Sequence, residues 1–427
     1  MTNYNNFLTA KEELENNTNI ERKKYLQKIK ILKNIYFQGP KTNSEICELF
    51  NFSSPTTIRL LNQLMEEGLV QKNGTGLSVG GRKPDLYDLQ EKCFYVLGIQ
   101  LERFQIRMAI FDNHNNKIAT IEDIPFHIEK DLSAVEPLYE AVKKMIRDSE
   151  IDTEKLLGIG ISMPGLVSSE EGKNFTYFLT EKESESLQQL LKKKFQKPVY
   201  ILNDAKSACL AEFRFGQANQ KKNVLVISMD WGVGLGIIID GKMHQGASGF
   251  AGEFGHIPLL EDGLLCHCGK RGCLETVASG IALARMAKEG IQAGENSVLS
   301  KLSDKEIEKI EPQTIIEAAN KGDQFAIKLL SEAGINLGKG IAVLIQLFNP
   351  ELIILEGKFA EAKQFITIPI QQSINTYCMA QLREKTEIVL SSLGQDSVLL
   401  GSVAAVMENI FRKQITTAKN AEKVMVY

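Results

Sequence analysis

The spacing of apolar residues changes at about residue 90, and this change limits the chain to two kinds of domain in a fixed order. Before it, apolar residues recur at helical spacing in three segments, and two short strand-like segments then flank the stretch NGTGLSVGGRKP. After it, strand-like and helix-like segments alternate, which is typical of an α/β fold. With 427 residues the chain is too long for one hydrophobic core. We expect a polar tail over residues 1–18, a helical domain with a hairpin over 19–90, and an α/β domain over 91–427.

The helical domain has the element order of a winged helix-turn-helix. Its helices end at Gly39 and Gly68, and the third helix begins where Ser54 can act as N-cap and Pro55 fits the first helical position. Three helices followed by a hairpin form a compact DNA-binding head, in which the third helix enters the major groove. The buried stripe of that helix is expected to contain Ile58, Leu61, Leu64 and Met65.

This domain is basic in a chain that is acidic overall. Residues 19–84 carry eleven Lys or Arg against five acids, a net charge of +6, whereas the whole chain has −3. Base edges and phosphates are read by hydroxyl, amide and guanidinium groups, and basic side chains on a hairpin tip enter narrow minor grooves. The alternative is a solvated polar helix face and a hairpin tip that only aids solubility. We favour operator DNA as the partner, with these residues as candidate contacts: Thr56, Thr57, Arg59, Asn62, Gln63, Arg82 and Lys83.

The segment CHCGKRGC is the strongest chemical signal in the chain. It places Cys266, Cys268 and Cys273 within eight residues, and His256 lies ten residues before the first of them. Three thiolates and one imidazole suit tetrahedral Zn²⁺ and leave no open coordination position, so the zinc would be structural. His267 could replace His256, although it is sterically worse placed between two cysteines. The remaining alternative is a set of reduced, metal-free thiols.

A second group of polar residues predicts a sugar site close to this zinc loop, which we place at residues 256–275. Carboxylates and amides accept and donate hydrogen bonds to sugar hydroxyls, and ligands bind at strand ends of open α/β sheets. Each residue taken singly is more often a surface or capping residue. The candidate ligand-binding residues are Asn203, Asp204, Glu253, His256 and Glu275.

The combined pattern resembles the ROK family of repressors, open reading frames and sugar kinases. The motifs that carry the resemblance are GVGLGI at 232–237, Gly246, GEFGH at 252–256, CxCGxxGCxE at 266–275, GIGISMPGLV at 158–167, NDA at 203–205 and NPELIILEG at 349–357. The N-terminal region is similar to the winged helix of the family's repressor branch, which includes regulators responsive to N-acetylglucosamine, xylose and glucose. The resemblance implies a two-lobed actin-like ATPase fold with a sugar in the cleft between the lobes.

The nucleotide-binding turns of the family's kinases are altered in this chain. Gln100 stands where the kinases have an aspartate, and residues 102–104 are Glu-Arg-Phe where small residues are expected. The second turn reads Asp-Trp-Gly at 230–232, and the third reads Glu-Gly at 356–357. Losing one preorganised donor costs about 10²- to 10³-fold in rate. We therefore expect no catalytic residue: Asp204, the family's base position, would bind sugar hydroxyls instead.

These inferences favour a sugar-responsive transcriptional regulator that is not an enzyme. We expect a repressor of carbohydrate uptake or catabolism genes, acting as a homodimer or homotetramer on operator DNA. The alternative is a ROK sugar kinase with an appended DNA-binding domain, and a third reading is an activator or a repressor that needs the sugar as corepressor. The sequence leaves open whether the effector is glucose, N-acetylglucosamine, xylose or a sugar phosphate. No apolar run approaches the roughly 20 residues that cross a bilayer, so we expect a cytoplasmic protein without a membrane partner.

Overall fold

The computed structural model describes residues 18–76, 83–179 and 185–423. The chain forms two compact units. The first unit comprises residues 1–161, 172–201 and 402–427, and the second comprises 162–171 and 202–401. Within the described residues, no helix combines the length and the apolar character needed to cross a membrane. The predicted tail lies outside the described residues except for residue 18, and the boundary at residue 90 stays a prediction.

The N-terminal part of the first unit has the helices and the hairpin that the sequence predicts. Its strands form a three-stranded sheet in the order β1-β3-β2, with β3 antiparallel to both neighbours. The short strand β1 was not predicted. The elements are α2 (Asn19–Gln38), β1 (Lys41–Thr42), α3 (Asn43–Phe50), α4 (Ser54–Glu66), β2 (Val70–Thr75) and β3 (Asp85–Leu89).

Helix α4 begins one residue earlier than the sequence analysis expects. As a result, one residue expected to be exposed is buried, and one expected to be buried is exposed. The N-cap of α4 is Ser53 rather than Ser54. Thr57 is fully buried. Its hydroxyl donates to the carbonyl oxygen of Ser53 at 3.3 Å. The prediction that Thr57 is exposed to DNA is therefore wrong. Ile58, predicted to be buried, is 43% exposed, and Leu60 takes its place in the core.

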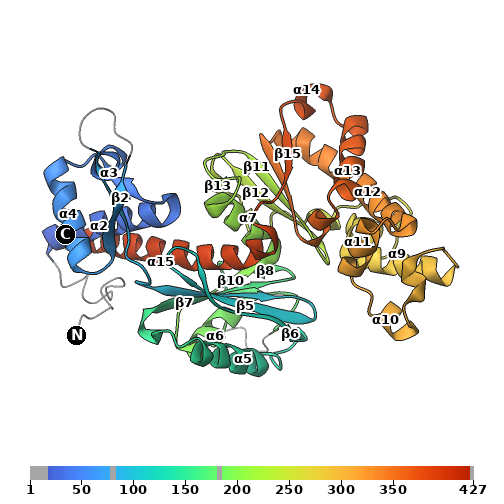
Figure 1. Cartoon of the computed structure of the whole chain (residues 1–427), viewed down its shortest axis with the longest axis horizontal. Coiled ribbons are helices and arrows are strands. Elements are labelled where there is room, and N and C mark those ends of the chain that lie inside the picture. The colour runs from blue at the N-terminus through green and yellow to red at the C-terminus, as the bar shows by residue number, and fades with distance from the viewer. Residues whose placement is uncertain (1–17, 77–82, 180–184, 424–427) are drawn as a thin grey trace. The chain divides into compact units, whose positions relative to one another are not determined.

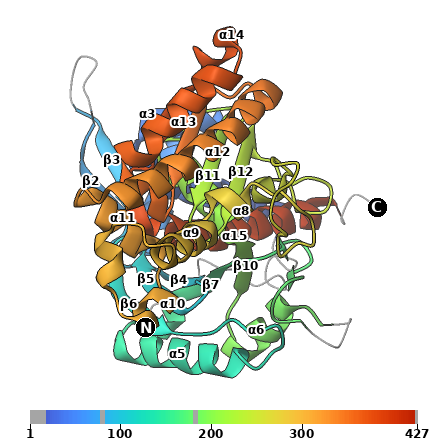
Figure 2. The ribbon, with the colours of Figure 1, turned by 90° about the vertical axis from the view of Figure 1, so that its right-hand side faces the viewer.

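The rest of the first unit is a five-stranded sheet covered by helices on both faces. The strand order is β10-β7-β4-β5-β6, with β5 antiparallel to both β4 and β6. Helices α5 and α6 lie on one face, and α15 lies on the other (Figure 1, Figure 2). A Cβ on Gly160 of β7 would lie 2.1 Å from the carbonyl oxygen of Ser402, so glycine permits this close approach to α15. The elements are β4 (Tyr95–Leu101), β5 (Gln105–Asp112), β6 (Lys117–Pro125), α5 (Val135–Asp148), β7 (Leu156–Met163), α6 (Leu187–Phe195), β10 (Val199–Asn203) and α15 (Ser397–Lys423).

The second unit is built on another five-stranded sheet, in the order β13-β12-β11-β14-β15. Strand β11 is antiparallel to β12 and parallel to β14. The side chains of Leu225 and Ile227 on β11 join the large core with the helices α9 and α11–α13, whereas Val224 and Val226 face α7. The elements are α7 (Asp204–Phe215), β11 (Val224–Met229), β12 (Val233–Ile239), β13 (Lys242–Met243), α8 (Glu275–Ala278), α9 (Gly280–Gln292), α10 (Asp304–Glu308), α11 (Pro312–Asn320), α12 (Gln324–Phe348), β14 (Leu352–Glu356), α13 (Gln364–Tyr377), α14 (Ala380–Arg383) and β15 (Glu387–Leu390).

Candidate functional site

The four predicted metal ligands come together in the second unit. One ligand atom from each of His256, Cys266, Cys268 and Cys273 lies within 4.8 Å of the others. His256 Nδ1 is 3.6 Å from Cys266 Sγ, and Cys268 Sγ is 3.6 Å from Cys273 Sγ. A tetrahedral ion with bonds of about 2.3 Å to sulfur holds its sulfur ligands about 3.8 Å apart. The group can therefore hold a metal ion.

Tight turns of the backbone bring the three cysteines together. The amide of Gly269 donates to the carbonyl of Cys266, and the amide of Cys266 donates to the carbonyl of Lys270. Gly269 has φ +87° and Gly272 has φ +75°, values that glycine adopts without strain. Burial raises the pKa of the Cys273 thiol to about 12, so its sulfur keeps a proton unless a cation replaces it.

His267 lies beside the four ligands, but its ring faces Glu275. Its Nδ1 is 3.2 Å from Glu275 Oε1, and its side chain is 64% exposed. It could hold a metal only in a second group, with His256 and Glu275. The structure therefore places His256, and not His267, in the four-ligand group.

The polar candidates Asn203 and Asp204 stand where β10 ends and α7 begins. Asn203 is the N-cap of α7: its Oδ1 accepts from the amide of Lys206, and its Nδ2 donates to the carbonyl of Gly165. Burial, helped by the charges of Asp230 and Glu253, raises the pKa of Asp204 to about 7. Asp204 is thus a carboxyl group whose charge changes near neutral pH.

The other carboxylates approach this group from two further segments. Glu275 Oε2 lies 3.4 Å from the amide nitrogen of Val233 and accepts from it. Its Oε1 is buried, and Nδ1 of His267 lies 3.2 Å from it. Glu253 is exposed and lies close enough to Asp204 and His256 for their charges to interact. A carboxylate oxygen carries two lone pairs, so Oε1 of Glu275 can accept from a ligand hydroxyl as well as from His267.

Two residues that the sequence analysis did not assign to the ligand site belong to the same neighbourhood. Lys206 is 6% exposed and donates from Nζ to the carbonyl of Gly249. Glu356 is 2% exposed and accepts a hydrogen bond from Ser397 Oγ at 2.9 Å. The sequence signal for Lys206 is its place in the first turn of a helix, next to two candidate residues. The sequence marks Glu356 only as part of the altered third turn, and its nearness to Asp204 depends on which side chains the fold brings together.

Three carboxylates gather where the altered turns of the second unit meet. Burial raises the pKa of Glu356 to about 7, and the charges of Asp230 and Asp204 contribute. Asp230 Oδ1 lies 3.8 Å from Lys358 Nζ and accepts from the amide of Trp231 at 2.9 Å. Because these carboxyl groups are negative when charged, they repel phosphate groups and so weaken nucleotide binding in this region.

The candidate DNA contacts differ in how exposed their side chains are to solvent. Arg59 and Asn62 are exposed on α4, while Thr56 and Gln63 are half-buried. Lys83 is exposed just before β3, and Arg82 lies outside the described residues.

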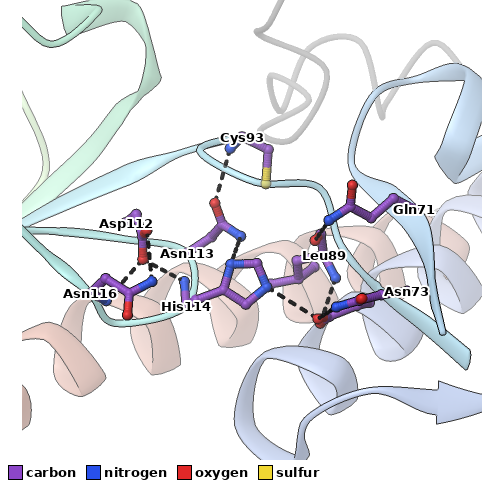
Figure 3. A network of polar contacts seen from close by, with 9 residues as sticks. Gln71, Asn73, Leu89, Cys93, Asp112, Asn113, His114 and Asn116 are labelled. Carbon is purple, nitrogen blue, oxygen red and sulfur yellow. Dashed lines mark hydrogen bonds and ion pairs between the residues drawn. The ribbon is translucent and has the colours of Figure 1, made fainter.

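A polar network holds the hairpin of the winged helix against the turn that follows β5 (Figure 3). Asn113 Nδ2 lies 3.0 Å from His114 Nδ1, so this ring nitrogen accepts and Nε2 carries the proton. Nε2 is 3.3 Å from Asp88 Oδ2, which also accepts from Asn73 Nδ2 at 3.1 Å. Helix α2 reaches the same turn, where Tyr36 donates to Asn115 Oδ1. The winged helix-turn-helix and the α/β part of the first unit are thus joined by satisfied, partly buried polar contacts.

A sequence model of the ROK family matches residues 96–409, which is most of the chain. The chain belongs to the ROK family. A second model, described as bacterial regulatory protein, arsR family, matches residues 27–72, the stretch from α2 into β2. The family assignment and the combination of a winged helix-turn-helix with a ROK actin-like fold are therefore confirmed.

Regulators are among the most similar relatives of this ROK protein. The xylose repressor of Caldicellulosiruptor bescii is 29% identical over 388 residues, which are 91% of this chain and 96% of the repressor. The N-acetylglucosamine repressor of Escherichia coli O157:H7 is 29% identical over 381 residues, 89% of this chain and 92% of that protein.

Solved structures of both branches of the family resemble the chain. A ROK family transcriptional regulator, described as a homologue of the Escherichia coli MLC protein, superimposes with a TM-score of 0.75 at 26% identity, covering 93% of this chain and 99% of that one. A ROK family glucokinase from Streptomyces griseus, in complex with glucose and AMPPNP, gives a TM-score of 0.63 at 29% identity, covering 72% of this chain and 97% of the kinase. The regulator therefore matches the winged helix as well, whereas the kinase matches a smaller part of the chain.

Proposed function

We propose that this ROK protein is a sugar-responsive transcriptional repressor that binds operator DNA through its winged helix. The observation that carries the proposal is the pairing of this head with a ROK domain whose nucleotide-binding turns hold Asp230 and Glu356. The relatives named as xylose and N-acetylglucosamine repressors support the same assignment. Sugar hydroxyls would bind at Asp204, Glu253 and Glu275, with Asn203 fixing the turn at Gly165 and His256 linking the site to the metal loop.

A structural zinc ion is the metal that fits the four-ligand group best. Three sulfurs and one imidazole suit Zn²⁺, and all four tetrahedral positions would be filled by protein atoms. The ion would tie Cys266 and Cys268 to the segment that carries His256. Because Glu275 follows Cys273 by two residues, the metal loop would also fix one wall of the sugar site.

Helix α15 offers a path from the sugar site to the DNA-reading head. It begins in the second unit, where the carbonyl of Val398 accepts from Ser207 Oγ of α7 at 2.9 Å. It ends in the first unit, where Gln414 accepts from Tyr25 of α2 at 2.8 Å. Sugar binding would change the arrangement of the winged helices, so that two of them in a dimer no longer match their half-sites. We therefore propose at least a dimer as the active species.

A residual sugar kinase is the second candidate, because the chain also resembles a ROK glucokinase. The acidic and bulky side chains of the altered turns count against it. Glu102, Arg103 and Phe104 occupy the first turn, where bulky side chains obstruct close approach of phosphate to the backbone.

The proposed function is tested by measuring DNA binding of the full chain in the presence of each of several sugars. Genomic fragments that the protein retains are identified, and affinity for them is measured with glucose, N-acetylglucosamine, xylose and their phosphates. We expect one sugar to raise the melting temperature and to weaken DNA binding about tenfold or more. Arg59→Ala is the matched control: it should lose DNA affinity, with a flatter salt dependence, and keep its sugar affinity. Binding to DNA that no sugar changes would refute the sensor.

A further inference from the structure

Lys206 occupies a position where a lysine is doubly unfavourable. It lies in the first turn of α7, where the partial positive charge of the helix N-terminus repels a cation. It is also 6% exposed, and burial lowers its pKa while the charge of Glu253 opposes this shift. A buried cation at a helix N-terminus needs compensation from specific contacts.

One such contact joins α7 to the loop that carries Glu253. Nζ of Lys206 donates to the carbonyl of Gly249, four residues before Glu253. The same loop is fixed at Gly252, which has φ +100° and whose added Cβ would lie 2.0 Å from the carbonyl oxygen of Leu235 in β12. The ammonium group is thereby held against the loop that carries Glu253.

The other candidate residues of the sugar site offer few hydrogen-bond donors. Asp204, Glu253 and Glu275 are carboxylates, which in their charged form only accept. Asn203 uses its Oδ1 as the helix cap and its Nδ2 on the carbonyl of Gly165. His256 Nδ1 faces the cysteines, so only its second ring nitrogen, Nε2, can donate to a ligand. A sugar hydroxyl both donates and accepts, and ring oxygens only accept, so a site with three carboxylates needs further donors to satisfy these groups. An ammonium group has three N–H bonds, and the carbonyl of Gly249 takes one of them.

We propose that Lys206 is a further residue of the sugar site and supplies the hydrogen-bond donor that its carboxylates cannot. The ligand class is a polyhydroxylated sugar that presents one oxygen acceptor to the ammonium group and hydroxyl donors to the acids. This inference rests on the proposed function, because it assigns a residue to the same site.

The test compares Lys206→Met with Lys206→Gln, using the sugar that the panel identifies. Lys206→Met keeps the length of the side chain and removes the donor, so sugar affinity measured by calorimetry should fall about tenfold to a hundredfold. Lys206→Gln keeps an amide donor and should recover part of this loss. Metal content and operator affinity without sugar should equal those of the wild type in both variants. Lys242→Met, at an exposed lysine of β13, is the matched control and should bind sugar normally.

The outcomes separate this inference from the function on which it rests. If the wild type binds sugar and Lys206→Met binds it equally well, the inference is overturned while the sensor stands. Equally weak binding by the Met and Gln variants would contradict the donor role. If the Met variant does not fold, Lys206→Ala, which also lacks the donor, decides: unchanged sugar affinity overturns the inference, and weaker binding at an unchanged melting temperature supports it. A wild type that binds none of the sugars overturns the inference together with the sensor.

Discussion

Cys268→Ser is expected to release the metal and to lower the melting temperature of the protein by about 10 °C or more. Cys268 is the exposed member of the four ligands, so the substitution leaves the hydrophobic core intact. Structural zinc sites contribute on the order of 10 kcal/mol of binding free energy, and losing even about 4 kcal/mol in a unit of this size corresponds to a shift of roughly 10 °C. The measurement is metal content per chain together with thermal unfolding.

The control for this substitution is His267→Ala. His267 is next to Cys268 in the sequence but lies outside the four-ligand group, so its loss should leave one metal ion per chain. A Cys268→Ser protein that still holds one equivalent of zinc, or that unfolds at the wild-type temperature, would contradict a structural role for this group.

Asp204→Ala is expected to weaken sugar binding by about a hundredfold while operator binding without sugar is unchanged. The carboxylate is placed to accept from sugar hydroxyls, and hydrogen bonds to a charged group contribute about 1.5–3 kcal/mol each. The raised pKa of about 7 adds a pH dependence. Because the charged form is the acceptor, wild-type sugar affinity should increase between about pH 6 and pH 8, and the alanine variant should lose this increase.

The Asp204→Asn variant serves as the control for folding. A carboxyl whose pKa is raised binds its proton more tightly in the folded state, so it lowers stability as the pH rises from about 4 to 7, and the full penalty is present above pH 7. The asparagine variant removes this penalty and should unfold at or above the wild-type temperature at pH 8. An Asn or Ala variant that sugar still releases from DNA with wild-type affinity would show that the sugar binds elsewhere.

Much of the fold could be predicted from the sequence because its elements carry strong local signals. The strands β7, β10, β11 and β14 are apolar runs bounded by turns, and α2 and α4 of the winged head end at or just before the glycines Gly39 and Gly68. The phase of α4 was wrong by one residue. Ser53 and Ser54 are equally suitable N-caps by residue type. The contacts of Thr57 with Ser53 and Cys47 decide between them.

The sequence predicts those parts of the candidate site whose residues lie close together in the chain. It does not predict the parts that depend on contacts between distant segments. The cysteines lie within eight residues, so their convergence follows from two glycine turns. Lys206 and Glu356 gain their significance from contacts with Gly249 and Ser397, which are about 40 residues away in the chain. No local pattern indicates such contacts, because they are set by the packing of α7 and α15.

The release of ADP is the measurement that tests the central claim most directly. The full chain is incubated with magnesium ATP and the sugar that raises its melting temperature, and ADP is measured over time. Asp230 and Glu356 lie in the turns that would hold the phosphates, so we predict no more ADP than in a mixture without the protein. The same preparation should still be released from DNA by this sugar. Sugar-dependent turnover at about 1 s⁻¹ or faster, in the range of ordinary enzymes, would contradict the account.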